Sequence, residues 1–218
     1  HGLLRLPEMI SAPVDIEKNF PEMAGRDMAA YFCFDTADCQ ELEVKVALSA
    51  VSTEGAVKNL KAEAEGRTFE QLADAARGMW DKELSMFTIE GSEDQKAMFY
   101  TSLYHTMINP SVYMDVDGNY RGLDHNIHKA DGFQNYTVFS LWDTYRAKQP
   151  LMTIIHPEKA GEFVATMVDI CDKQGDLPVW HLWGNETDCM VGDPGIPVVA
   201  DAIVKGIGGF DQIGRAAC

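Results

Sequence analysis

Basic residues are scarce in this 218-residue chain, which has 18 Lys and Arg against 34 Asp and Glu and a formal net charge of −16. Binding to nucleic acid depends on clustered Lys and Arg that neutralise phosphates, so the deficit argues against a nucleic-acid partner. Anionic membrane surfaces are disfavoured for the same reason. No apolar run approaches the roughly 18 residues that a membrane-spanning helix needs. The composition therefore predicts neither a nucleic-acid-binding nor a membrane-spanning protein.

Closely spaced cysteine pairs are also missing. An odd number of cysteines without a C-x-x-C pair argues against a zinc site and against a dense disulfide framework; the five are Cys33, Cys39, Cys171, Cys189 and Cys218. A Cys33–Cys39 bridge across a tight turn stays open, beside the simpler interpretation of two half-buried small residues. The sequence begins with His1 and lacks a basic-plus-apolar leader, so we expect an internal or processed piece of a longer protein.

Hydrophobic residues make up 46% of the chain, which is enough to build a core. The first fifty residues predict β-structure: a short aromatic strand at 30–34, and a second strand at 42–48. In the second, apolar residues alternate with mainly polar ones, which is the period of a strand with one buried face. Two strands are not stable alone in water, so we expect them to end a larger sheet.

After Ser52 the pattern becomes helical. Two capping boxes, 68–71 and 92–95, each place a hydroxyl at the helix start and Gln three residues later. The second helix should end at Asn109-Pro110, because Pro breaks a helix. Further helices are predicted at 138–148, 157–173 and 196–207, and a hairpin is predicted at Asp117-Gly118.

Two polar clusters are weak metal candidates. Residues 115–119 begin like a calcium loop, but Tyr120 and Asn126 stand where such a loop needs Gly and a bidentate Glu. A turn is therefore favoured there. His125 and His128 lie beside Asp124, but no third ligand follows at a diagnostic spacing, so a solvated loop is favoured.

Two aromatic segments are stronger candidates for a sugar site. On a helix, Trp142 and Arg146 share a face and Asp143 lies beside Arg146. A ring that stacks on a sugar, together with charged groups for its hydroxyls, is typical of pyranose sites; a helix-capping Asp–Arg pair beside a core Trp is an equal alternative. The second segment, 180–187, has two Trp flanking a His before Gly-Asn-Glu-Thr, which favours a binding loop over packed Trp with a capping Asn or Thr.

At several points the sequence resembles glycoside hydrolase family 92, the calcium-dependent exo-acting α-mannosidases of glycan-degrading bacteria. The resemblance covers residues 30–210 and rests on five segments: 47–52 (ALSAVS), 99–106 (FYTSLYHT), 115–118 (DVDG), 136–146 (YTVFSLWDTYR) and 182–187 (LWGNET). It implies a mixed fold: the tail of an N-terminal β-sandwich in 1–54, a helical linker in 55–92, and the first helices of an (α/α)6 barrel in 93–218. The remainder of its own catalytic domain would then be a partner of this chain.

The resemblance also implies where the chemistry lies. The family's general acid and base belong to motifs of the types Gly-Asn-x-Trp-Gln-Tyr and Gly-Asn-Asp-x-x-Gly-Gln-Met, which are absent from these 218 residues and are expected downstream of Cys218. What transfers is binding of a mannose-containing oligosaccharide, an N-glycan or a mannan; the candidate residues are Trp142, Asp143, Trp183, Asn185 and Glu186. Most ligands of the Ca²⁺ cofactor would also lie outside the chain.

Two rival functions remain open at this stage. One is a non-catalytic carbohydrate-binding or structural module, and the other is a different (α/α)6 glycosidase. The family further implies a periplasmic or cell-surface location, because its substrates are extracellular glycans. The downstream acid and base motifs would separate the catalytic function from the non-catalytic one.

Overall fold

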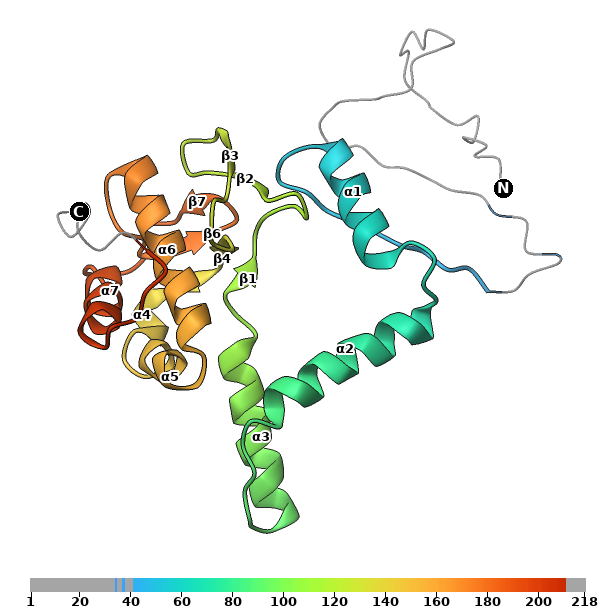
Figure 1. The fold of residues 1–218 in the computed structure, drawn as a ribbon, viewed down its shortest axis with the longest axis horizontal. Coiled ribbons are helices and arrows are strands. Elements are labelled where there is room, and N and C mark those ends of the chain that lie inside the picture. The colour runs from blue at the N-terminus through green and yellow to red at the C-terminus, as the bar shows by residue number, and fades with distance from the viewer. Residues whose placement is uncertain (1–33, 35–36, 38–40, 211–218) are drawn as a thin grey trace, which may run out of the picture. The chain divides into compact units, whose positions relative to one another are not determined.

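The structure is a computed structural model, and it describes residues 34, 37 and 41–210. The chain divides into two units, His1–Val44 and Lys45–Cys218. All of the helices and strands named below lie in the second unit (Figure 1). Among the described residues, no helix is long and apolar enough to cross a membrane.

Three helices open the second unit, and their starts agree with the sequence. Helix α1 (Thr53–Ala64) begins at Ser52, whose side chain accepts the Gly55 N–H. Helices α2 (Phe69–Leu84) and α3 (Glu93–Met107) both begin with the predicted capping boxes, in which the cap hydroxyl and the Gln side chain bond each other's backbone N–H. Each box satisfies two N–H groups that have no partner within the helix. These predictions are confirmed.

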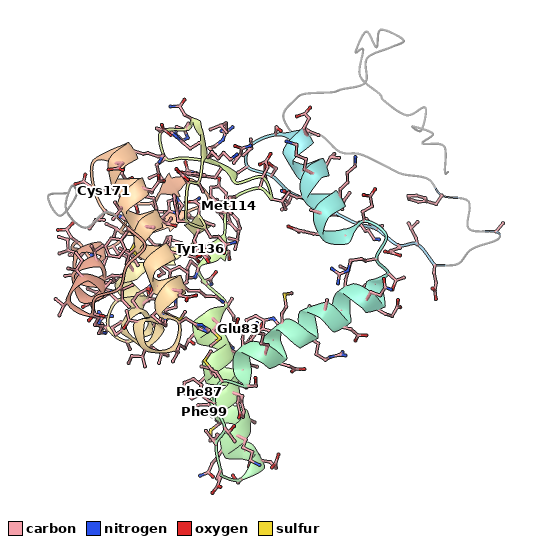
Figure 2. All side chains as sticks on the ribbon, viewed as in Figure 1. Glu83, Phe87, Phe99, Met114, Tyr136 and Cys171 are labelled. Atoms are coloured by element: carbon pink, nitrogen blue, oxygen red, sulfur yellow. The ribbon has the colours of Figure 1, made fainter. Side chains whose placement is uncertain are left out.

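Aromatic side chains hold α2 against α3. Phe87 and Phe99 meet edge to face across the connection between the two helices, with ring centroids 5.9 Å apart (Figure 2). Trp80 and Tyr104 form a second such pair at 4.5 Å, and the Tyr100 hydroxyl donates to the Phe87 carbonyl. Edge-to-face pairs of this kind contribute about 0.5–1.5 kcal/mol beyond the burial of their area.

The strands are short and form three small antiparallel sheets. Strand β1 (Ser111–Val112) pairs with β4 (Tyr136–Thr137), and β2 (Asn119–Arg121) pairs with β3 (Ile127–Lys129). The third sheet has the order β5 (Phe139–Ser140), β6 (Trp180–Leu182), β7 (Asn185–Glu186). A turn does occur at 115–118, with Gly118 at φ 84°, but the hairpin of paired strands is formed at 122–126 instead. The predicted position of the hairpin was therefore wrong.

The core is built around α6 (Pro157–Gln174), on which α5 (Lys148–Ile155) and α7 (Gly195–Val204) pack. Ten of its residues are buried, and Tyr136 and Phe139 meet Phe163 edge to face, at 4.8 and 6.3 Å. The helices predicted at 157–173 and 196–207 thus form. The first of them ends at Gly175, whose φ of 97° is accessible to glycine at little cost.

Two predicted elements are wrong. Residues 42–48 form no strand: every apolar side chain of the alternating set is more than half exposed, and no described strand pairs with them. Alternation indicates a face but supplies no hydrogen-bonding partner. Residues 138–148 form β5 and then only a four-residue helix, α4 (Leu141–Thr144), because the chain pairs with β6 before the helix starts. The strand at 30–34 and the Cys33–Cys39 bridge fall on positions that, apart from Phe34, lie outside the described residues.

A buried carboxylate joins α1 to the 115–118 turn. Asp115 is 3% exposed; its side chain accepts from Asn59 Nδ2 at 2.8 Å and from Ser49 Oγ at 2.7 Å. The Asn59 amide oxygen in turn accepts the Val116 N–H. The predicted turn at 115–118 is confirmed by the hydrogen bond from the Gly118 N–H to the Asp115 carbonyl, at 2.8 Å.

We predict that Gly55→Ala destabilises the protein. A Cβ at this position would lie 2.1 Å from Asp115 Oδ2, so either α1 or the buried carboxylate must move. The expected loss is about 1–3 kcal/mol, as for other overpacked sites, and it should appear as a lower midpoint of thermal unfolding. The matched control is Gly78→Ala in α2, where a Cβ meets nothing within 4 Å and helix propensity should add up to about 1 kcal/mol of stability. Equal behaviour of the two variants would contradict the packing argument.

Candidate functional site

The β5–β6–β7 sheet brings the two predicted aromatic segments together. Residues 141–146 follow β5 directly, and residues 183–186 form the turn and last strand on the other side of β6. Ser140 pairs with Trp180, and Leu182 pairs with Asn185. All five predicted sugar-binding residues therefore lie on or next to one sheet, although they come from segments far apart in the sequence.

Trp142 and Asp143 present a ring and a carboxylate on the surface. Trp142 is 36% exposed, and the Arg146 guanidinium lies 4.9 Å from its ring centroid while donating to the Trp142 carbonyl. Asp143 accepts a hydrogen bond from the Ser140 hydroxyl. Among the described residues, Asp143 and Arg146 form no ion pair, so the arginine supports the ring and the serine orients the carboxylate.

Trp183 occupies a strained position at the tip of the β6–β7 hairpin. Trp183 and Gly184 are the two loop residues, with φ of 50° and 77°, as a type I′ turn requires. This turn favours Asn-Gly, and a non-glycine residue in a sparsely populated region costs about 1–3 kcal/mol. The Trp183 side chain is nevertheless 55% exposed, with Tyr113 edge-on at 5.9 Å. The geometry thus holds an exposed ring where local preference would place Asn.

A buried pair behind the sheet fixes this turn. Thr137 Oγ1 accepts the Trp183 N–H at 2.7 Å and lies 3.2 Å from His181 Nδ1. A hydroxyl donates one hydrogen bond and accepts up to two, so the tautomer of His181 decides which of the two groups donates in this contact. His181 is 2% exposed, and its burial lowers its pKa to about 4.

Glu186 is engaged by the backbone. Its two carboxylate oxygens accept four main-chain N–H groups at 2.8–3.2 Å, those of Val179, Trp180, Thr187 and Asp188. A carboxylate has about four acceptor sites, so little capacity is left for a ligand. This geometry favours a role in shaping the hairpin. Asn185, by contrast, is exposed and donates only to the Trp183 carbonyl, at 3.3 Å.

The histidines and acids predicted as weak metal candidates form no metal cluster. His128 pairs with Asp124 at 2.9 Å, and hydrogen bonds from Asn126 and His128 lower the pKa of Asp124 to about 2. Asp117 pairs with Lys58. Within the described part of the chain, no group of three or more His, Cys, Asp or Glu could hold a metal ion. These residues therefore do not fit a calcium site.

Thr137 and His181 lie inside two of the quoted segments, but sequence reasoning gave neither of them a role. Both are buried, and each has a partner on another strand, which no local motif reveals. The only available signal was a polar residue within an apolar strand segment, which required a partner in the core.

Comparisons with known proteins agree on one family. The model described as the glycosyl hydrolase family 92 catalytic domain matches residues 55–217. Among solved structures, the chain is similar to the GH92 α-mannosidase BT3965 of Bacteroides thetaiotaomicron, solved with mannoimidazole, at 47% identity and TM-score 0.73; the match covers 75% of this chain and 22% of that one. The inverting GH92 mannosidase BT2199 of the same species matches at 29% identity and TM-score 0.69. This match also covers 75% of this chain and 22% of the other.

A third solved structure, the GH92 glycosyl hydrolase ccman5, matches at 27% identity and TM-score 0.65 over 77% of this chain and 23% of its own. No curated protein sequence matches the chain. The chain thus spans less than a quarter of the length of these structures. Over the matched part, the chain and these structures share a helical architecture with small antiparallel sheets.

We predict that Trp183→Asn raises stability. Asn tolerates positive φ in a type I′ turn, so relief of strain should outweigh the lost contact with Tyr113 and give a net gain of about 1 kcal/mol. The thermal midpoint of the variant should therefore rise. His125→Asn, at a second positive φ of 62° in the hairpin 122–126, is the matched control and should also be stabilising. A fall in the midpoint for Trp183→Asn alone would show that the ring is held there for packing.

We also predict that His181 makes stability depend on pH. Its pKa is near 6.5 when unfolded and about 4 when folded, so between these values the unfolded chain binds more protons. The contribution of His181 to the free energy of unfolding should be fully present above pH 6.5. It should be lost as the pH falls toward 4, which lowers stability by on the order of 3 kcal/mol. The difference between wild type and His181→Gln, followed by urea unfolding across this range, isolates the effect. His125→Gln should leave the wild-type slope intact; an unchanged slope in His181→Gln would be the contrary result.

Proposed function

Because the chain belongs to glycosyl hydrolase family 92, we propose that it is part of an inverting exo-α-mannosidase that releases terminal α-mannose from N-glycans or mannans. The observation that carries the proposal is the 47% identity to an α-mannosidase solved with a mannose analogue, over three quarters of this chain. The exposed Trp142, Asp143 and Trp183, which lie next to one sheet, supply a surface suited to a pyranose.

In this proposal the chain contributes binding and orientation. Inverting hydrolysis needs a general acid at the leaving oxygen and a base that activates water on the opposite face. We assign both groups to sequence beyond Cys218, and Glu186 to neither, because its oxygens already accept four backbone N–H groups. Trp142 would stack on the terminal mannose, and Asp143 would accept hydrogen bonds from its O4 and O6 hydroxyls.

The domain organisation is part of the same proposal. Residues 1–54 would end an N-terminal β-sandwich, 55–92 would link the domains, and 93–218 would begin an (α/α)6 barrel completed by the rest of the catalytic domain. Large apolar side chains exposed on the helices support a covering partner of this kind; they include Met98, Ile154, Ile196 and Val204.

The calcium implied by the family would be held by residues outside the described ones, since these do not fit a metal site. No step assigned to this chain depends on the ion. We further propose that the protein is exported to the periplasm or cell surface. Cys171 is buried and disulfide-bonded, and disulfides persist mainly in oxidising compartments, which supports export.

The test of function uses the complete natural protein that carries this chain. Incubation with α-mannobiose or mannan, followed by NMR, should show mannose released first as the β-anomer, because the reaction inverts the anomeric carbon. Glycan binding without any release would favour the non-catalytic carbohydrate-binding module. Release first as the α-anomer would overturn inversion.

We predict that Asp143→Ala lowers kcat/KM by about 10–100-fold, because a hydrogen bond to a charged group contributes about 1.5–3 kcal/mol. Asp143→Asn should be milder, since the amide keeps an acceptor. The loss should shrink on a mannoside that lacks the 6-hydroxyl if Asp143 reads that group.

Asp74→Ala is the matched control, an exposed carboxylate on α2 whose loss should leave kcat/KM unchanged. If wild type and Asp143→Ala discriminate equally between mannosides with and without the 6-hydroxyl, while folding is intact, Asp143 does not contact it. Its role would then be confined to the hydrogen bond with Ser140.

A further inference from the structure

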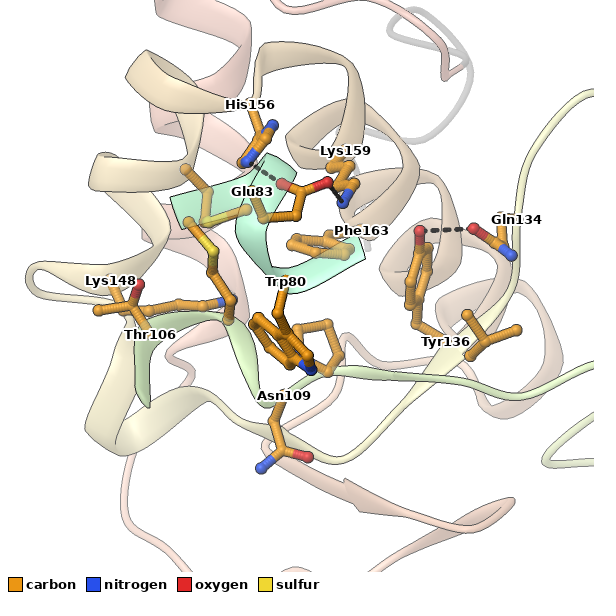
Figure 3. A pocket seen from close by; sticks show the side chains of 14 residues that line it. Trp80, Glu83, Thr106, Asn109, Gln134, Tyr136, Lys148, His156, Lys159 and Phe163 are labelled. Carbon is orange, nitrogen blue, oxygen red and sulfur yellow. Dashed lines mark hydrogen bonds and ion pairs between the residues drawn. The ribbon is translucent and has the colours of Figure 1, made fainter. Parts of the chain in front are cut away.

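A cavity of about 230 Å³ lies between the end of α2, the end of α3 and the α5–α6 pair (Figure 3). At about 30 Å³ per water it has room for roughly seven waters or one small molecule. A second cavity of about 220 Å³ shares four lining residues with it: Thr106, Asn109, Pro110 and Lys148. Lys148 therefore lies on the wall between the two spaces. Trp142, Asp143 and Trp183 line neither.

The carboxylate in the first cavity already has partners. Glu83 Oε2 lies 2.9 Å from His156 Nε2, and Glu83 Oε1 lies 3.4 Å from Lys159 Nζ (Figure 3). The histidine contact is close but badly aligned, so the buried Nε2 has no hydrogen-bond partner among the described residues. The negative charge of Glu83 is thus compensated, while one ring nitrogen still lacks a partner.

The Lys148 amine has no such compensation. Its Nζ lies 4.8 Å from the centroid of the Phe163 ring, and no carboxylate of the described chain forms an ion pair with it. Burial lowers its pKa to about 8, so it is mostly protonated at neutral pH. A cation–π contact offsets only part of the cost of holding an ammonium group without a counter-charge in this half-buried position. The two cavities therefore carry an excess of positive charge.

We propose that these cavities bind a small oxyanion, a phosphate or a carboxylate, through the Lys148 amine. The anion supplies the missing counter-charge, and its oxygens accept from the ammonium group in a space already partly removed from water. Anionic acceptors form the stronger class of hydrogen bond with such a donor. The ring of Trp80 and the side chain of Met152 complete an apolar wall that keeps this interaction out of bulk solvent.

The experiment titrates the complete natural protein with sodium phosphate and, separately, with sodium acetate, against sodium chloride of equal ionic strength at pH 7. Binding to the folded state alone raises the thermal midpoint as ligand concentration increases. We expect one of the two oxyanions to raise the midpoint with saturation. The anion whose effect on the midpoint saturates at the lower concentration identifies the ligand class as phosphate or carboxylate.

Lys148→Met keeps the length and apolar body of the side chain and removes the charge, so its affinity for the oxyanion should fall about tenfold or more. Lys129→Met, an exposed lysine on β3, is the control and should bind as the wild type does. Lys148→Gln replaces the first variant if that one does not fold. Saturating shifts of equal size in all variants, or no shift in wild type with either anion, would overturn the proposal.

Discussion

The pairing of β5 with β6 is the contact on which the arrangement of the candidate site depends. It joins Phe139 to His181 and Ser140 to Trp180, and so brings two segments far apart in the sequence side by side. Strands of two or three residues are not stable alone. They persist here because Phe139 and Leu141, which are 1% and 0% exposed, are buried in the core that α6 organises. The sugar-binding surface that we propose is thus fixed by apolar packing beneath it.

Local signals in the sequence were sufficient for the starts of α2 and α3. A capping box requires only four consecutive residues, and both boxes form as predicted at Thr68 and Ser92. The same holds for the end of α6 at Gly175. These features are decided within one or two turns of chain, so they do not depend on which elements pack nearby.

Pairing partners could not be predicted in the same way. The alternation in 42–48 looked like a strand, yet no described strand pairs with it, and the turn at 115–118 was placed correctly while its strands pair elsewhere. Candidate site residues were found from their chemistry, but their roles depend on distant neighbours. Glu186 was a candidate for binding sugar, and only the folded hairpin reveals the four backbone donors that surround its carboxylate.

The buried bond between Asn59 and Asp115 has a consequence for synthesis of the chain. Its two residues are 56 positions apart, so α1 emerges from the ribosome well before the carboxylate that completes its burial. At about 5–20 residues per second, the delay is roughly 3–11 s. During that interval the Asn59 side chain can bond to the Leu48 carbonyl but lacks its later partners, Asp115 and Val116. Helix α1 is therefore synthesised first, and its contacts are completed only when the 115–118 turn has been synthesised.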